Sequence, residues 1–307
     1  MRIHVLPSTL LALVFLMCAG LALAQQAQPP QPQKIGQDLY AYISDNDGSA
    51  NSTFLVTSEG ILVVDTGLNP HEAQKLLAAI RSVSPQPIRY IINTHYHPDH
   101  QGGNATLSKD AIVITTQFTR ERTQALLAGP LASRRGDFRL ADETVADSFT
   151  IFLGSYPIEV TAPGKGHTLG DLVVDFPQQQ AMALGDLFMH GSCPAMDEGS
   201  VENWIKTLDS VLAKPLRAAV PGHFALGSKR DVRFFRDYLS DLFAQVKEMA
   251  ARGDSLEQIR RGIRMEKYLS LRQFPQYEAT FEDNAASIYQ QLEAGPLGGR
   301  VRSPSTP

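Results

Sequence analysis

Hydrophobic and polar positions follow two different periods in the first hundred residues, and each period predicts a different kind of element. Short apolar runs at 54–56 and 61–64, separated by a turn, predict two strands joined as a hairpin. Apolar positions at helical spacing predict a helix over 70–83, with Asn69 as its N-cap. The apolar run at 88–92 then predicts a strand that ends directly before a polar loop.

The middle of the chain continues as short strands interrupted by helices. Helices are expected at 117–127 and 201–212, and an arginine-rich surface loop at 129–142. Strands are expected at 111–114, 149–153, 158–161, 172–175, 181–184 and 218–220. Mixed sheets whose outer faces are covered by helices would give an α/β (α+β) architecture.

The last quarter of the chain changes to long helical periodicity. Ser228, with Asp231 three residues later, is a helix-start signal, and apolar positions then recur at helical spacing until Gly253. More helix is expected from Ser255 and over 281–292. We therefore predict a C-terminal helical extension over 229–293 that packs on the main body, followed by a disordered tail over 294–307.

The first 24 residues have the pattern of a cleaved signal peptide. Arg2 gives a polar start, an apolar stretch begins at Leu10, and Ala22-Leu23-Ala24 is a small-residue cleavage site. The alternative is an uncleaved membrane anchor, for which the apolar stretch is short. Residues 25–36, rich in Gln and Pro, are predicted to form a disordered linker. The expected location is periplasmic or secreted in a bacterium, with no stable membrane anchor after cleavage.

Composition and charge narrow the range of functions. The 307 residues are 43% apolar and carry a formal net charge of −4, which is typical of a globular protein without a nucleic-acid-binding face. Cys18 would leave with the signal peptide, so Cys193 would be the single thiol and no intrachain disulfide could form. An exported chain of this size can be stable on its hydrophobic core alone.

The loop after the strand at 88–92 concentrates metal-binding side chains. Between Thr94 and Gly103 the chain carries His95, His97, Asp99 and His100. Further candidates follow other predicted strands, each beside a glycine: His167, Asp186 and His223. Strand ends meet at one edge of a sheet, and glycine permits close backbone approach there. Uncharged imidazoles and ionised carboxylates gathered in one cleft favour a zinc site.

These segments resemble the hydrolases of the metallo-β-lactamase-fold superfamily. The matching marks, in the family's order, are Val64-Asp65-Thr66-Gly67, the loop from His95 to Gly103, Gly166-His167-Thr168, Gly185-Asp186 and Pro221-Gly222-His223. The resemblance implies a four-layer αββα sandwich over 37–228, with two metals at one edge. It also implies that His95, His97 and His167 hold the first Zn²⁺, that Asp99, His100 and His223 hold the second, and that Asp186 bridges both. Iron and manganese are the alternative metals.

The resemblance also implies a mechanism. Two Zn²⁺ ions about 3.5–4 Å apart share one water and lower its pKa to near neutral. A metal-bridging hydroxide is then the nucleophile, and Asp99 is the catalytic residue that orients it and passes a proton to the leaving group. The chain contains no G-x-S-x-G nucleophile elbow. Asp65 is a candidate hydrogen-bond partner of a ligand histidine, or else a cap of the Thr66-Gly67 turn.

Several other polar and aromatic side chains stand near these motifs. Thr168 and Asn104 are expected to form hydrogen bonds at a turn and at a helix start. Tyr96 and Tyr156 either touch substrate or, as is commoner, are half-buried aromatics. His190 is a candidate for lining the cleft. Cys193 is expected to be a bystander, because Asp186 occupies the position where some relatives have a metal-binding cysteine.

The substrate stays open, because the fold alone does not select it. The first hypothesis is an exported zinc hydrolase of a small cyclic amide or ester, with β-lactamase or lactonase activity. Met189 stands where common lactamases place a drug-binding lysine, and Phe224-Ala225-Leu226-Gly227 departs from the pattern of a thioesterase of the glyoxalase II type. The second is an iron-dependent oxidoreductase on the same fold. The third is a non-catalytic periplasmic metal-binding partner of a quinoprotein system.

Overall fold

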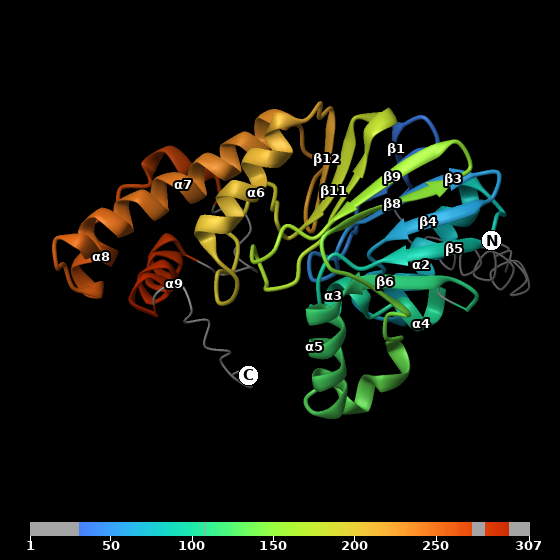
Figure 1. Ribbon diagram of the computed structural model, residues 1–307, viewed down its shortest axis with the longest axis horizontal. Helices are drawn as coiled ribbons and strands as arrows, with labels where there is room; N and C mark the ends of the chain where they lie inside the picture. Colours follow the sequence, from blue (N-terminus) through green and yellow to red (C-terminus); the bar gives the residue numbers. More distant parts are fainter. Residues whose placement is uncertain (1–30, 108, 272–279, 295–307) are drawn as a thin grey trace, which may run out of the picture.

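The computed structural model describes residues 31–107, 109–271 and 280–294 (Figure 1). The strands are β1 (Gln33–Gly36), β2 (Leu39–Tyr42), β3 (Ser52–Thr57), β4 (Gly60–Val64), β5 (Ile88–Ile92), β6 (Ile112–Thr116), β7 (Glu143–Val145), β8 (Ser148–Leu153), β9 (Tyr156–Thr161), β10 (Val173–Phe176), β11 (Ala181–Gly185) and β12 (Ala218–Pro221). They form one sheet in the order β1-β2-β3-β4-β5-β6-β7 and a second in the order β12-β11-β10-β9-β8.

Helices flank the two sheets and extend beyond them. The α-helices are α2 (Pro70–Val83), α3 (Pro98–Gln101), α4 (Asn104–Leu107), α5 (Gln117–Ala128), α6 (Val201–Ala213), α7 (Lys229–Ala251), α8 (Leu256–Gly262) and α9 (Phe281–Ala294). Short 3₁₀ turns are η1 (Ala132–Asp137), η2 (Pro177–Gln179) and η3 (Glu266–Leu271). In the part of the chain that the structure describes, no helix combines the length and the apolar composition that a membrane crossing needs.

Three buried apolar clusters separate four layers. The middle cluster lies between the two sheets and includes Leu62 and Val174. A second cluster lies between the first sheet and α2, where Leu76 and Ile80 are buried. The third lies between the second sheet and helices α6 and α7, around Trp204. Helix, sheet, sheet and helix therefore stack as an αββα sandwich, which confirms the predicted fold class (Figure 1).

Strand direction brings the predicted site segments to one edge of the sandwich. β4 runs parallel to β5, and β11 runs parallel to β12. The segments after β5, β11 and β12 therefore leave at the carboxyl ends of the two sheets. β10 is antiparallel to both β9 and β11, so the segment between β9 and β10 emerges at the same end as the one after β11. Sheet topology thus gathers loops that lie far apart in the sequence.

Most local predictions are confirmed. β3 and β4 form the antiparallel hairpin, and β5 occupies 88–92 as expected. Asn69 caps α2 by accepting a hydrogen bond from the Glu72 backbone N–H, and proline stands at the first helical position. Asp231 accepts hydrogen bonds from the backbone N–H and the hydroxyl of Ser228 at the start of α7.

The prediction of a disordered linker over 25–36 is wrong at its end. Residues 33–36 form β1, which pairs antiparallel with β2, and Ile35 is buried between the two sheets. The composition of this segment, rich in Gln and Pro, gave no strand signal, because its one apolar side chain in the strand, Ile35, is buried only when the sheet forms. Two short strands, β2 and β7, were also not predicted. The predicted loop at 129–142 contains the 3₁₀ turn η1.

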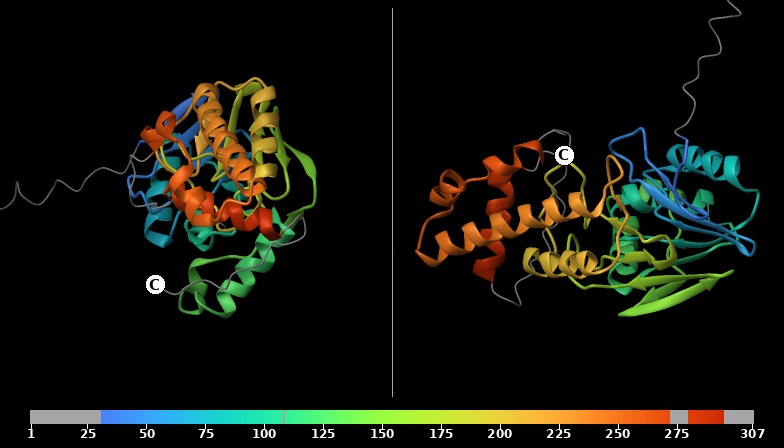
Figure 2. Two further views of the ribbon diagram at one scale, coloured as in Figure 1. Left: turned by 90° about the vertical axis from the view of Figure 1, so that its left-hand side faces the viewer. Right: turned by 90° about the horizontal axis from the view of Figure 1, so that it is seen from above.

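The C-terminal helices form the end of the molecule away from the sheets, as Figures 1 and 2 show. Helix α7 has 23 residues, and its buried face includes Phe235, Leu239 and Val246. These side chains join the cluster around Trp204 together with residues of α9. Ala294 still belongs to α9, where the prediction began the tail. The predicted signal peptide over 1–24 and the rest of the predicted tail lie outside the described residues.

Candidate metal centre

The loop after β5 packs tightly against the turn after β4. His95 and His97 precede the short helix α3, and Asp99 and His100 lie on it. Both glycines that follow α3 are required by close packing. A Cβ atom on Gly102 would lie 2.0 Å from the Leu68 carbonyl oxygen, and one on Gly103 would lie 2.2 Å from the Thr66 carbonyl oxygen. The Gly-Gly pair therefore lets the loop seat its histidines against the core.

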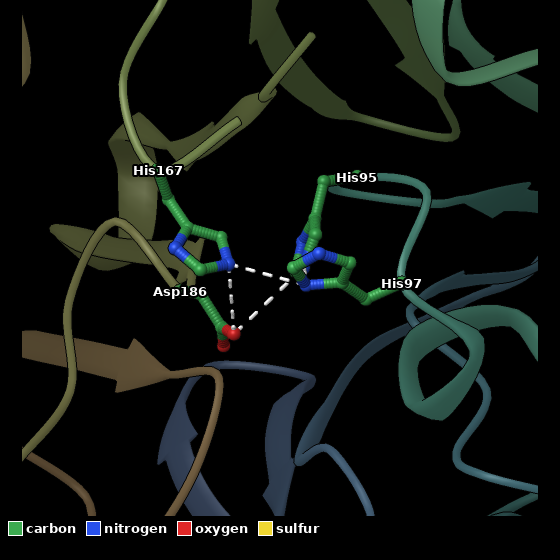
Figure 3. Close-up of side chains that lie close together, drawn as sticks. All are labelled: His95, His97, His167 and Asp186. Atoms are coloured by element: carbon green, nitrogen blue, oxygen red, sulfur yellow. Dashed lines mark hydrogen bonds and ion pairs between the residues drawn. The ribbon is translucent and has the colours of Figure 1, made fainter. Parts of the chain in front are cut away.

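A first group of donor atoms comes from three histidines and one carboxylate. One donor each from His95, His97, His167 and Asp186 lies within 4.8 Å of the others (Figure 3). His97 Nδ1 is 2.9 Å from His95 Nε2 and 3.2 Å from His167 Nε2. Asp186 Oδ2 is 3.3 Å from His167 Nε2 and 3.7 Å from His95 Nε2. Four polar atoms thus face one small volume.

A second group of donors lies on the other side of the same carboxylate. Donor atoms of Asp99, His100 and His223 lie within 4.8 Å of one another. Asp99 Oδ2 is 3.0 Å from His223 Nε2 and 3.5 Å from His100 Nε2. Asp186 Oδ1 is 3.3 Å from His100 Nε2 and 3.6 Å from His223 Nε2. Asp186 therefore turns one oxygen to each group, and all seven predicted residues come together.

Glycines make room for the Asp186 carboxylate. A Cβ on Gly222 would lie 1.8 Å from Asp186 Oδ1. Gly185 has a φ of +51°, and a Cβ there would lie 2.5 Å from the Thr94 hydroxyl oxygen. The glycines beside the predicted ligands therefore have a steric reason, and a larger residue at either position would displace the carboxylate or the histidine loop.

Hydrogen bonds on the far side of three rings fix which nitrogen carries the proton. Asp65 accepts hydrogen bonds from the Thr94 backbone N–H and hydroxyl, each at 2.8 Å, and lies 2.8 Å from His100 Nδ1. The Thr94 oxygen then accepts from His95 Nδ1 at 3.1 Å, and the Asp47 carbonyl accepts from His223 Nδ1 at 3.2 Å. In all three rings Nδ1 is the donor to the supporting oxygen, so Nε2 is the nitrogen that faces the centre. The predicted role of Asp65 as partner of a site histidine is confirmed.

Burial and neighbouring charges set the protonation of the group. Burial lowers the pKa of His167 to about 4 and that of His95 well below its usual range, so both rings are uncharged at neutral pH. Burial alone would raise the pKa of Asp186, but His100 and the other histidines outweigh it and hold that pKa well below its usual range. At Asp99, too, burial is outweighed by the nearby His100 and His223, and the pKa is about 2. The centre therefore combines uncharged His95 and His167 rings with ionised carboxylates, and Asp186, Asp65 and Asp99 outweigh burial to raise the pKa of His100 well above its usual range.

These features fit divalent cations. His100 Nε2 and Asp186 Oδ1 are buried, and neither makes a hydrogen bond within the described residues. His95 Nε2 has no proton to donate, yet it lies 2.9 Å from another ring nitrogen. Two donors on a tetrahedral ion such as Zn²⁺ are about 3.3 Å apart, close to the separations seen in both groups. Lone pairs that face one another at such distances are stabilised by a cation between them.

The remaining predicted residues have structural roles. Thr168 donates a hydrogen bond from its hydroxyl to Asp171 at 2.7 Å, and the Asn104 amide donates to Asn93 at 2.7 Å, as expected. Burial raises the pKa of Asp171 to about 7. Tyr156 begins β9 and donates to Asp38, at the strand end opposite His167. It therefore does not reach the centre.

Three further residues lie on the helical side of the fold. His190 lines a separate pocket with Phe188 and Asp231, and its Nδ1 is 2.9 Å from the Ala225 carbonyl oxygen. Cys193 is buried in the cluster around Trp204 and belongs to neither donor group. Met189 is buried in the same cluster. His190 belongs to neither donor group, and its ring stacks on Phe188.

Sequence reasoning missed side chains that support the ligands rather than join them. Thr94 links Asp65 to His95, and its only signal was its place directly before the loop. Glu198 accepts a hydrogen bond from the Tyr96 hydroxyl at 2.5 Å, which shows Tyr96 to be a buried, anchored aromatic. No local pattern marks Glu198, because its partner lies about a hundred residues earlier.

Comparisons with known proteins agree on one family. The model of the metallo-beta-lactamase superfamily matches residues 45–223. A metallo-beta-lactamase type 2 of Bacillus cereus is 28% identical over 197 residues, which are 61% of this chain and 72% of that protein. The structure of a metallo-beta-lactamase from Pontibacter korlensis superposes with a TM-score of 0.57 at 24% identity, covering 68% of this chain and 98% of that one.

A second solved structure resembles more of the chain. A stereoselective inverting sec-alkylsulfatase from Pseudomonas sp. superposes with a TM-score of 0.70 at 16% identity. The superposition covers 88% of this chain and 50% of that one. At this coverage the likeness in fold extends past residues 45–223 and into the C-terminal helices.

Proposed function

This chain belongs to the metallo-beta-lactamase superfamily of hydrolases. We propose that it is an exported enzyme that uses two zinc ions to hydrolyse a cyclic amide or ester. The observation that carries the proposal is the Asp186 carboxylate, whose two oxygens face two separate groups of donors. One metal ion would need only one of these groups, whereas two groups that share the Asp186 carboxylate suit two ions.

The ligand assignment follows the two groups. His95, His97 and His167 would hold the first zinc, Asp99, His100 and His223 the second, and Asp186 would bridge them. Zinc ions bound in this way lower the pKa of water and polarise a carbonyl oxygen. The donor set of imidazoles and carboxylates suits zinc, and iron or manganese remain alternatives that metal analysis separates.

Asp99 is the residue we propose to be catalytic. Its side chain is 20% exposed, whereas that of Asp186 is 6% exposed, so Asp99 is the carboxylate that reaches solvent at the rim. Its low pKa keeps it ionised, so it can orient the attacking water as a hydrogen-bond acceptor, and it can take up the water's proton once bound metal has made that water acidic. From the rim it can then deliver that proton to the leaving nitrogen or oxygen.

The relatives, the N-terminal sequence and one side chain bear on the substrate class. The relatives named metallo-beta-lactamase favour a cyclic amide, and the signal-like residues 1–24 favour an exported enzyme. Buried Met189 offers no cation to a substrate carboxylate at the position where common lactamases carry a lysine. A lactone or another cyclic amide therefore fits at least as well as a β-lactam drug.

The decisive experiment is a hydrolysis panel on protein whose metal content has been measured. The panel contains β-lactams, lactones, thioesters, phosphodiesters and, because of the fold likeness to an alkylsulfatase, a secondary alkyl sulfate. We expect about two zinc ions per chain and turnover of a cyclic amide or ester. Turnover of thioesters alone would support the glyoxalase II-type alternative. Bound iron with oxygen consumption would support an oxidoreductase, and zinc-loaded protein inactive on every class would support a metal-binding partner protein.

Replacing Asp186 tests the bridge directly. Asp186→Asn leaves one good oxygen donor where two anionic oxygens stood, so we expect zinc content to fall toward one ion and kcat to fall on the order of 100-fold or more. Asp175→Asn is the matched control, because Asp175, on β10, is also a buried carboxylate but pairs with Lys214 at the end of α6. Full zinc content and full rate in Asp186→Asn would contradict the bridging assignment.

A further inference from the structure

The five histidines of the centre are not held in the same way. Three have a hydrogen-bond partner on the ring nitrogen that faces away from the centre: His95 with Thr94, His100 with Asp65, and His223 with the Asp47 carbonyl. His167 Nδ1 is buried without a hydrogen bond, and the described residues offer none to Nε2 of His97. Both unsupported rings belong to the first group. Such partners normally fix the orientation of ligand histidines.

His97 is held instead by the aromatic side chain beside it. The Tyr96 ring meets the His97 ring edge-on, with ring centroids 4.6 Å apart. Tyr96 is 5% exposed and is fixed at its far end, because its hydroxyl donates to Glu198 Oε1 at 2.5 Å. Arg122 of α5 lies over the Tyr96 ring at 5.1 Å, and its Nη2 is 3.6 Å from the same Glu198 oxygen. Glu198 therefore anchors the ring that supports His97.

The residues directly after Glu198 support the turn that carries His167. Gly199 has a φ of +73°, and a Cβ there would lie 2.0 Å from the Gly166 carbonyl oxygen and 2.9 Å from that of His167. The Ser200 backbone N–H donates to the Gly166 carbonyl at 3.1 Å. Residues 198–200 thus contact the backbone around His167 and, through Glu198, anchor Tyr96 beside His97.

We propose that residues 198–200, here called the brace, are positioning residues that orient His97 and His167 toward the first metal. The proposal rests on the metal-binding function proposed above. The brace takes the place of the missing hydrogen bonds in two ways. Glu198 holds the Tyr96 ring against His97, and the backbone of residues 199 and 200 contacts the turn that carries His167. It has no counterpart at the second group, where Asp65 and the Asp47 carbonyl do this work. Damage to the brace should therefore weaken metal binding at one group and spare the other.

The test measures two zinc dissociation constants by competition with a chromophoric chelator, together with the absorption spectrum of the Co²⁺-loaded protein. A reference variant, His167→Ala, lacks a first-group ligand, and its remaining tight site identifies the second group. The test variants are Glu198→Ala, which removes the anchor of Tyr96, and Gly199→Ala, which pushes on the His167 turn. Glu202→Ala is the matched control, because it removes an exposed glutamate four residues further along that pairs only with Lys206 among the described residues.

We expect Glu198→Ala and Gly199→Ala each to weaken first-group affinity about 10- to 100-fold and to change the Co²⁺ spectrum, with second-group affinity unaltered. Glu198→Gln, which can still accept the Tyr96 hydrogen bond, should recover most of the loss. A thermal melt of the metal-free proteins checks folding, and Glu198→Ala carries the test if Gly199→Ala does not fold.

Two outcomes would overturn the brace. Wild-type constants at both groups in Glu198→Ala would show that His97 needs no such anchor. Equal losses at both groups would show a general structural effect instead of positioning. Failure of the wild-type protein to bind two metals is a different result, because it overturns the proposed function itself.

Discussion

At the scale of single residues, Asp65 shows how side-chain hydrogen bonds stabilise an unfavourable backbone conformation at the centre. Its φ of 58° lies in the left-handed region, which costs a residue other than glycine energy unless its surroundings compensate. The compensation is visible, since its carboxylate bonds the Thr94 backbone, the Thr94 hydroxyl and His100. One side chain thereby joins the turn after β4 to the donor loop after β5.

Asp65→Asn tests that link. An amide keeps the size and tolerates the left-handed backbone, but it offers one accepting oxygen instead of two and no charge for the His100 ring. We expect zinc affinity at the second group to fall about 10- to 100-fold. Asp38→Asn is a close control, because Asp38 also has a positive φ of 57° and bonds the Tyr156 hydroxyl away from the centre. Equal affinities in the two variants would refute the assigned role of Asp65.

At the scale of elements, α2 is defined by its first residues and by the face it buries. Asn69 satisfies the Glu72 backbone N–H, proline supplies a preset φ at the first position, and Leu76 and Ile80 pack on the first sheet. The helix follows directly on the turn that contacts the donor loop, where the Leu68 carbonyl lies against Gly102.

Removing the cap should have a small, separate effect. We expect Asn69→Ala to lower the free energy of unfolding by about 1 kcal/mol, because the Glu72 N–H loses its side-chain acceptor. Asn69→Asp keeps an accepting oxygen and should stay close to wild type. Urea unfolding of the two variants gives the comparison. Identical midpoints for Asn69→Ala and the wild type would mean that water replaces the cap without cost.

At the scale of the whole molecule, the sandwich and the C-terminal helices share one core. Trp204 of α6 is fully buried and packs against Phe235 of α7, and Tyr238 of α7 accepts a hydrogen bond from the Asn284 amide of α9. Trp204 also meets the His167 ring, with centroids 5.6 Å apart. The family match ends at residue 223, before α7 begins, yet the helices beyond it pack around Trp204, whose ring contacts a histidine of the centre.

We therefore expect a chain that ends at residue 228 to lose cooperative folding. Without α7 and α9, the apolar face around Trp204 would be exposed to water. A milder change, Leu239→Ala, should lower the unfolding free energy of the intact chain by about 2–5 kcal/mol, because Leu239 is fully buried in that core. Soluble yield and thermal unfolding measure both effects. A monomeric truncated protein that melts at the wild-type temperature would show that the sandwich is independent of the extension.

Local patterns in the chain were enough to predict most elements and all seven donor residues. The strand at 88–92, the cap at Asn69 and the helix start at Ser228 are visible because each depends on residues within a few positions of one another. The donors were recognisable because four of them crowd one loop after a strand, and because His167, Asp186 and His223 each follow a strand and stand beside a glycine. The resemblance to a known family then ordered these segments into one site.

Tertiary structure alone decided how those donors divide and what supports them. Asp186 faces both groups because the strand order of the second sheet puts the segment after β11 between those that carry His167 and His223. Glu198 reaches Tyr96, and residues 33–36 become β1, through partners that no local periodicity reports. Sequence patterns record what one segment favours, whereas these contacts depend on how separate segments meet when the layers pack.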